Sequence, residues 1–223
     1  MRADTVIPAM PLAATADSPV ARRLGTLAVG LALVGIGVAS TIRAELGVAP
    51  YDVLTTGLVA LTGIPISLAA MLLPVAFVLV GVLLGGRPGP GTVLAVLLVG
   101  PILGLTLDAL PIQEAMTVRL VYFVVGFMVI SAGITAVVIS EIGSGPAELV
   151  MLAIHDRGYP LAPVRTGIEL TCVAIGWVVG GQVGVGTVVF AILIGPTLKR
   201  TLAAAGFDPT RASEASDCAA PGA

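Results

Sequence analysis

Long apolar runs alternate with short polar stretches along most of this chain. Six runs contain few charged residues and cover about 24–43, 65–86, 91–109, 119–140, 164–182 and 186–203. Because about 20 apolar residues in a helix cross the hydrocarbon of a bilayer, each run predicts a transmembrane helix. The pattern therefore predicts an all-α, polytopic membrane protein with six spans.

Two shorter stretches, at about 50–61 and 146–156, interrupt this pattern. Twelve helical residues cover only about 18 Å, so neither stretch is long enough to cross the hydrocarbon. Each is expected to form a half-helix that is either re-entrant or interfacial. The residues expected to shape the starts of the half-helices are Gly47, Pro50, Gly143, Gly145 and Pro146.

Each half-helix also carries an acid in its expected first turn, Asp52 in GVAPYD and Glu148 in GSGPAE. Proline is favourable at the first position of a helix, and a carboxylate there interacts well with the helix dipole. Structural capping alone accounts for this pattern. The alternative is that both acids line an ion or solute path, because broken helices at membrane depth occur only inside protein or beside water.

The chain repeats itself, first at a distance of 96 residues and then of 95. The matches include Arg23, Gly30, Gly37, Glu45, Gly47 and Pro50 with Arg119, Gly126, Gly133, Glu141, Gly143 and Pro146, and later Gly81, Gly91 and Gly100 with Gly176, Gly186 and Gly195. This predicts two membrane repeats, residues 21–110 and 117–203. Tails at 1–20 and 204–223 are expected to be disordered, the first of them cytoplasmic.

The orientation of the two repeats depends on the half-helices. Three spans per repeat would invert the second copy, whereas spanning half-helices would make the copies parallel. Arg87 has no basic counterpart in the second copy, and the basic ends at Arg157, Arg165, Lys199 and Arg200 have none in the first. Inverted copies predict this alternation, because basic residues favour cytoplasmic ends.

Composition excludes several classes of function. Eleven Lys and Arg and a net charge of −2 give no basic surface for nucleic acid. The two cysteines and the single histidine suggest neither a disulfide framework nor a metal site, and no hydrolase motif is present. We therefore expect no catalytic residues, no metal and no cofactor, and we do not expect an enzyme.

Glu169 follows Arg165 by four residues within an apolar run, so the two share one face of the predicted helix. One interpretation is a structural ion pair near the cytoplasmic end. The other is a contact with a substrate or coupling ion.

The stretches LGVAPYDVLTTGL, GSGPAELVMLAI and VRTGIELTCVAIGWVVGGQVGVGT, followed by IGP, resemble the YitT/YczE family of bacterial multi-pass membrane proteins, and most closely its YczE branch. The resemblance covers about residues 22–203. The chain departs from the second motif of that family, with Ala147 in place of arginine and Glu148 in place of aspartate. The resemblance implies a fold but little chemistry.

We therefore expect a small-solute or ion transporter or channel in the bacterial plasma membrane, with both termini cytoplasmic and a pathway between the repeats. Asp52, Glu148, Glu169 and Arg165 are the candidate pathway or substrate contacts. The alternative is an accessory or scaffolding protein without transport activity. Expected partners are the lipid bilayer, an unidentified small solute or ion, and either a second copy of the chain or another membrane protein.

Overall fold

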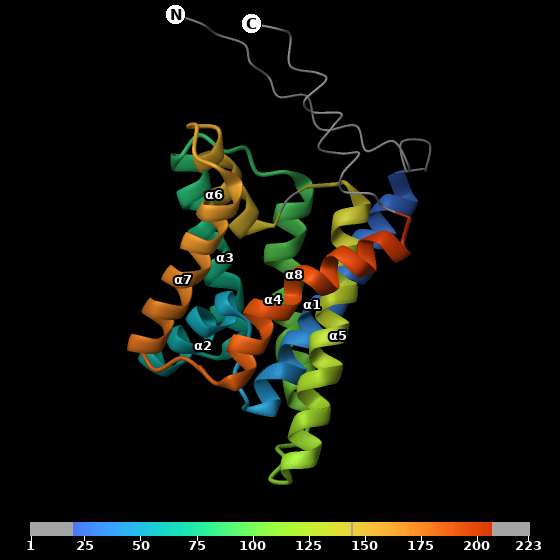
Figure 1. Cartoon of the computed structure of the whole chain (residues 1–223), viewed down its shortest axis with the longest axis vertical. Coiled ribbons are helices and arrows are strands. Elements are labelled where there is room, and N and C mark those ends of the chain that lie inside the picture. The colour runs from blue at the N-terminus through green and yellow to red at the C-terminus, as the bar shows by residue number, and fades with distance from the viewer. Residues whose placement is uncertain (1–19, 144, 207–223) are drawn as a thin grey trace, which may run out of the picture.

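A computed structural model of the chain describes residues 20–143 and 145–206, which contain eight α-helices and no strand (Figure 1). The helices are α1 Val20–Ala44, α2 Pro50–Thr62, α3 Ile66–Leu83, α4 Pro90–Ala109, α5 Met116–Ser140, α6 Pro146–His155, α7 Leu161–Val178 and α8 Val185–Ala204. The predicted all-α class and the predicted order of six long and two short helices are confirmed. The predicted tails lie outside the described residues, apart from Val20 and residues 204–206.

Glycines end two of the long helices earlier than the apolar pattern predicts. α3 ends at Leu83 and α7 at Val178, whereas the predicted runs extend to 86 and 182. Gly85 and Gly180 adopt positive φ values of 82° and 92°, which a helix does not continue through. The next glycine in each case donates its N–H to the carbonyl five residues back, at 2.8 and 2.7 Å, and so satisfies the helix end.

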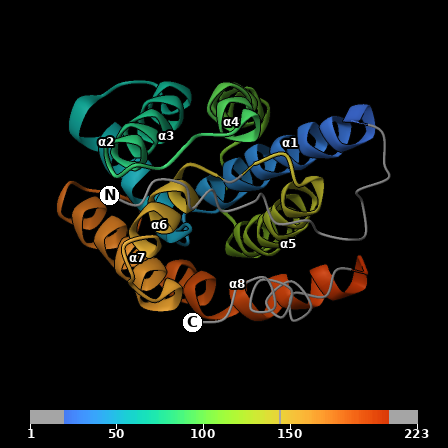
Figure 2. The same ribbon diagram turned by 90° about the horizontal axis from the view of Figure 1, so that it is seen from above.

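α1 and α5 lie antiparallel at the centre of the bundle, with α4 beside α1 and α8 beside α5 (Figures 1 and 2). Glycines bring the two central helices into close contact. A Cβ atom built on Gly37 would lie 2.8 Å from the carbonyl oxygen of Gly126, and one on Gly30 would lie 2.9 Å from that of Gly133. Small residues at such crossings let helix backbones pack closely where lipid offers no hydrophobic driving force.

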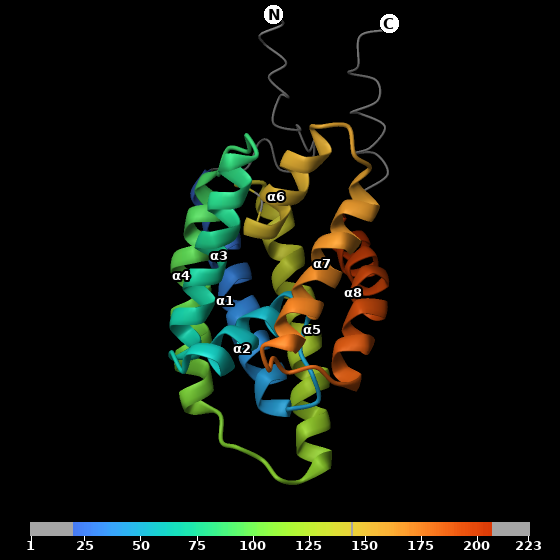
Figure 3. The same ribbon diagram turned by 90° about the vertical axis from the view of Figure 1, so that its left-hand side faces the viewer.

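The two short helices pack against long helices that are distant in sequence. α2 packs mainly on α7, and α6 packs mainly on α3. Figure 3 shows α6 towards the end of the bundle where α1 begins, and α2 towards the opposite end. The helices α2, α3, α6 and α7 thus form a second group beside the group of α1, α4, α5 and α8.

The six long helices are long and apolar enough to cross a membrane. Many of their large apolar side chains point outwards, including Leu79 on α3, Leu105 on α4 and Ile192 on α8, which are 59%, 71% and 65% exposed. In water such a surface would favour aggregation, whereas in a bilayer it contacts lipid. The chain is therefore a multi-pass membrane protein.

The contact between α3 and α4 has no equivalent between α7 and α8. A Cβ atom on Gly100 of α4 would lie 2.7 Å from the carbonyl oxygen of Ser67 and 2.5 Å from Cγ of Met71, both on α3. A Cβ atom on Gly195 of α8 would meet nothing within 4 Å. Across the described residues, α7 and α8 share almost no contact, so these two helices lie apart where α3 and α4 are packed.

Candidate functional site

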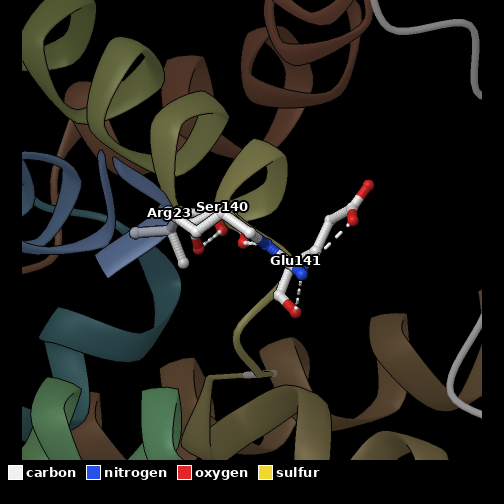
Figure 4. A network of polar contacts seen from close by, with 4 residues as sticks. Arg23, Ser140 and Glu141 are labelled. Carbon is white, nitrogen blue, oxygen red and sulfur yellow. Dashed lines mark hydrogen bonds and ion pairs between the residues drawn. The ribbon is translucent and has the colours of Figure 1, made fainter. Parts of the chain in front are cut away.

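Two arginines hold the ends of the central helices, and Figure 4 shows the first of them, Arg23, beside Ser140 and Glu141. Arg23 at the start of α1 donates hydrogen bonds of 2.9 Å to the carbonyl oxygens of Ser140 and Glu141, and it pairs with the Glu141 carboxylate at 3.2 Å. A guanidinium group at this place satisfies carbonyl groups that a helix C-terminus leaves without partners.

Arg119 at the start of α5 makes the corresponding contacts at the other end of the bundle. It donates hydrogen bonds of 2.8 Å to the carbonyl oxygens of Ala44 and Glu45, and it pairs with the Glu45 carboxylate at 3.4 Å. Glu45 and Glu141 both adopt the left-handed conformation, with φ of 51° and 53°. This conformation is unfavourable for a residue with a side chain, and the arginine contacts help to stabilise it.

The segments after these two glutamates lead from the ends of the central helices to the starts of α2 and α6. Gly47 has a φ of 109°, and a Cβ atom there would lie 2.8 Å from backbone nitrogens of Gly184 and Thr187. The N–H of Gly186 donates to the carbonyl oxygen of Leu46 at 2.7 Å. The chain can pass this close to the start of α8 only because position 47 has no side chain.

The segment before α6 makes the same kind of contact with the start of α4. Gly143 has a φ of 155°, and a Cβ atom there would lie 3.2 Å from the backbone nitrogen of Gly91. Gly91 donates its N–H to the carbonyl oxygen of Ile142 at 3.3 Å. The predicted shaping roles of Gly47 and Gly143 therefore have a geometric basis in these two backbone contacts.

Both half-helices start at the predicted prolines, Pro50 and Pro146, each in the first helical turn. Neither preceding residue, Ala49 or Gly145, supplies a side-chain cap. A Cβ atom on Gly145 would collide with the carboxylate of Glu148, so this carboxylate folds back over the start of its own helix. That position favours the capping interpretation for Glu148.

Asp52 differs from Glu148 in its burial, because Asp52 is half-buried and Glu148 is exposed. Neither carboxylate makes a hydrogen bond or an ion pair with another described residue. α2 is not one of the six spans, and burial beside the neighbouring helices raises the pKa of Asp52 from its ordinary value to about 7. This acid therefore changes its charge near neutral pH.

Tyr51 lies next to Asp52 in the first turn of α2. Its ring packs against Phe77 of α3, with centroids 5.2 Å apart, and its hydroxyl is buried without a hydrogen-bond partner in the described part of the chain. Burial raises the pKa of Tyr51 well above its ordinary value, and the charges of Asp52, Cys172 and Glu148 raise it further. Groups from α2, α6 and α7 thus lie within electrostatic range of one hydroxyl.

The predicted pair on α7 lies elsewhere. Arg165 donates to Glu169 at 3.1 Å, and their side chains are 52% and 36% exposed. The pair therefore has the geometry of the predicted ion pair on one helix face, and it is not part of the group around Tyr51.

Sequence reasoning missed two members of this group. Tyr51 lies between Pro50 and Asp52, which were both selected, and its position in an expected half-helix was the available signal. Cys172 was interpreted as a packing residue, and no local sequence pattern indicates any other role for it. Among the described residues, no three His, Cys, Asp or Glu side chains are grouped so that they could hold a metal ion.

Comparison with known proteins places the chain in a family. Residues 21–202 match DUF6198, a family of unknown function. An uncharacterized protein of Haemophilus influenzae is 30% identical over 179 residues, which cover 80% of this chain and 82% of that protein. The uncharacterized membrane protein YczE of Bacillus subtilis is 28% identical over 176 residues, which cover 78% of this chain and 82% of that protein. No solved structure matches the chain, and the resemblance to YczE-like membrane proteins is confirmed.

Proposed function

The chain belongs to DUF6198, a family of unknown function, and we propose that it is a bacterial plasma-membrane transporter or channel for a small solute or ion. The observation that carries this proposal is that α2 and α6, each shorter than the six spans, lie towards opposite ends of the bundle (Figure 3) and pack on α7 and α3, which are distant in sequence. Interrupted helices whose starts meet at mid-depth are typical of substrate and ion sites in transporters. The proposal assigns the chain no catalytic step.

We further propose that the chain consists of two inverted three-span repeats. Arg23 and Glu45 in the first repeat are equivalent to Arg119 and Glu141 in the second, each 96 positions later. Arg23 pairs with Glu141, and Arg119 pairs with Glu45, so each arginine pairs with the glutamate of the other repeat. This exchange supports the proposal, because copies related by an approximate twofold axis in the membrane plane would exchange their contacts in this way between opposite ends.

The half-helix contacts follow the same exchange. A Cβ atom on Gly176 of α7 would lie 2.6 Å from the carbonyl carbon of Val53 in α2, and one on Gly81 of α3 would lie 2.8 Å from Cγ of Leu149 in α6. Gly81 and Gly176 are 95 positions apart, and Val53 and Leu149 are 96 apart. Each half-helix therefore packs on the equivalent long helix of the other repeat.

The difference between the repeats supports movement. In the first repeat α4 packs on α3 through Gly100, whereas in the second the equivalent Gly195 of α8 faces no neighbour. Two copies with related sequences have thus adopted two different arrangements. A transporter in which α7 closes on α8 while α3 separates from α4 would expose the central site alternately to the two sides.

The distribution of basic residues supports cytoplasmic termini. The ends of helices on the side where α1 begins and α8 ends carry Arg22, Arg23, Arg87, Arg157, Lys199 and Arg200. The opposite ends carry only Arg43 and Arg119 among the described residues, and both donate hydrogen bonds to backbone carbonyls. By the positive-inside rule the first side is cytoplasmic.

Disulfide cross-linking tests the proposed movement without knowledge of the substrate. In a background without native cysteines, the pair Ser67→Cys and Gly104→Cys should cross-link readily. A Cβ atom on Gly104 would lie 2.8 Å from that of Ser67, so a shift of about 1 Å between α3 and α4 brings the two into the range of a disulfide, about 3.5–4.5 Å. The equivalent pair in the second repeat, Ala162→Cys and Lys199→Cys, should cross-link more slowly, as α7 closes on α8. If the first pair reacts fully and the second never does, the gap is static and the accessory role becomes the better explanation.

A further inference from the structure

The helices α7 and α8 leave an opening between them. They run in different directions from the segment that joins them, residues 179–184, and they share almost no contact (Figure 1). α7 is the least buried of the six spans, and its buried residues are Cys172 and Gly176. A helix face that no protein covers at membrane depth is in contact with lipid. The opening therefore has an occupant from the bilayer unless a second protein fills it.

The repeat relation identifies the face of α8 that lies along this opening. In the first repeat a Cβ atom on Gly104 of α4 would lie 2.8 Å from that of Ser67 on α3, and the position equivalent to Gly104 on α8 is Lys199, 95 residues later. Positions four, seven and eleven residues before Lys199 share its side of the helix. They are Gly195, which meets nothing within 4 Å, and Ile192 and Val188, which are 65% and 58% exposed.

The chemistry of this face changes from apolar to basic along its length. Lys199 lies at the end where α7 begins and α8 ends, and it is exposed without an ion pair or hydrogen bond to any described residue. Arg200 beside it is also exposed and unpaired. The acid on the first turns of α7, Glu169, is already paired with Arg165 at 3.1 Å. This end of the opening therefore carries an excess of positive charge.

We propose that the opening between α7 and α8 binds an anionic phospholipid, with an acyl chain along the apolar face of α8 and the headgroup phosphate at Lys199. Basic pockets between spanning helices on the cytoplasmic side bind anionic lipid headgroups. From Val188 to Lys199 the face extends about 16 Å at about 1.5 Å per residue, which is close to half of the roughly 30 Å of hydrocarbon and so to the depth of one leaflet.

The charge of this face favours a lipid over a second copy of the chain. A twofold contact places the same surface of both copies together, so it would bring two Lys199 side chains close to each other. The inference rests on the proposed equivalence of the two repeats, which locates the face, and it requires no transport.

Fluorescence quenching by brominated lipids measures which lipid lies against this face. Trp177→Phe removes the single tryptophan, and Ile192→Trp places a reporter two helical turns from Lys199. The full chain is reconstituted in phosphatidylcholine with a rising fraction of either brominated phosphatidylglycerol or brominated phosphatidylcholine. The two quenching curves give the ratio of the binding constants. Leu97→Trp is the matched reporter, because it is the equivalent position on α4 and is 52% exposed, but α4 packs on α3.

At Ile192→Trp, phosphatidylglycerol should bind about fivefold more tightly than phosphatidylcholine, the contribution of one cation near a membrane surface. Lys199→Gln should remove this preference, and Lys199→Arg should keep it because the charge remains. Arg87→Gln should leave it unchanged, because it removes an exposed cation at the same end of the bundle but away from α7 and α8. Leu97→Trp should report no preference.

Equal binding constants at Ile192→Trp, or a preference that survives Lys199→Gln, overturn the inference. An equal loss in Arg87→Gln, or an equal preference at Leu97→Trp, also overturns it, because the attraction then belongs to the whole protein surface. Quenching by neither lipid overturns it by showing that α7 or a second copy covers the face. If Ile192→Trp does not fold, Val188→Trp gives the same measurement from the same face. Because no flux is measured, these outcomes are independent of whether the chain transports a solute.

Discussion

The crossing of α1 and α5 at Gly37 gives the sharpest prediction about stability. In Gly37→Ala the new Cβ atom would lie 2.6 Å from Cγ1 of Ile130, and 2.8 Å from the carbonyl oxygen of Gly126 and from the backbone nitrogen of Ile130. Carbon atoms pack best at about 3.5–4.0 Å, so the two central helices must separate by a fraction of an ångström. Overpacking of this kind typically costs about 1–3 kcal/mol.

A matched variant in the same helix removes the other effects of the substitution. Gly25 is exposed on α1, and a Cβ atom there would meet nothing within 4 Å. Both substitutions gain the helix propensity of alanine over glycine, about 1 kcal/mol, so the difference between them measures the clash alone. Gly25→Ala should therefore be as stable as the wild type or more stable, and Gly37→Ala less stable than Gly25→Ala by about 1–3 kcal/mol.

The assay is unfolding of each purified variant in mixed micelles with increasing sodium dodecyl sulfate, followed by circular dichroism of the helices. Tryptophan fluorescence from Trp177 gives a second reading on α7, outside the crossing. Equal midpoints for Gly25→Ala and Gly37→Ala would refute the close crossing of α1 and α5. A lower midpoint for Gly25→Ala alone would show that contacts at the start of α1 had been misassigned.

Three further predictions concern charge. The raised pKa of Asp52 makes the folded state bind a proton more tightly than the unfolded state does, so the free energy of unfolding should fall as pH rises from about 4 to about 7. In a profile of melting temperature against pH, Asp52→Asn should flatten this part of the curve. Arg119→Ala and Arg23→Ala each remove two charged hydrogen bonds to helix-end carbonyls, worth about 1.5–3 kcal/mol each. Lysine at either position should restore less than half of the lost melting temperature, because it lacks the planar fork of arginine. A cysteine replacing Arg87 in a cysteine-free background should react with impermeant maleimide only after the cytoplasmic side is opened, and labelling of intact cells would contradict the proposed orientation.

Local signals in the sequence were sufficient for the order and the approximate bounds of the helices. Runs of apolar residues identified all six spans, and Pro50 and Pro146 located the first turns of the half-helices. These signals act within one or two turns, through burial in lipid and through the fixed φ of proline, so they need no knowledge of neighbours. The errors at the ends of α3 and α7 arose because an apolar count does not detect a glycine in the left-handed conformation.

The candidate site depended on contacts that no local pattern contains. Asp52 and Glu148 have the same position in similar motifs, but Asp52 is half-buried, whereas Glu148 is exposed and folds over the start of its own helix. Arg165 and Glu169 were correctly expected to share one helix face, but the sequence could not tell whether that face points inwards or outwards. Spacing determines which residues share a face, and packing determines what the face meets.

The sequence by itself determined that this chain has six helices long and apolar enough to cross a membrane. It also determined where the two half-helices begin and which positions recur after 95 or 96 residues. Only the tertiary structure decided that Arg23 caps a helix that ends 117 residues later, that the ring of Tyr51 packs on Phe77 of α3, and that α4 packs on α3 while α8 lies apart from α7. The physical reason is that lipid and protein interiors are similarly apolar. Composition therefore shows that a helix is in the membrane, whereas the fit of particular side chains and glycines selects its neighbours.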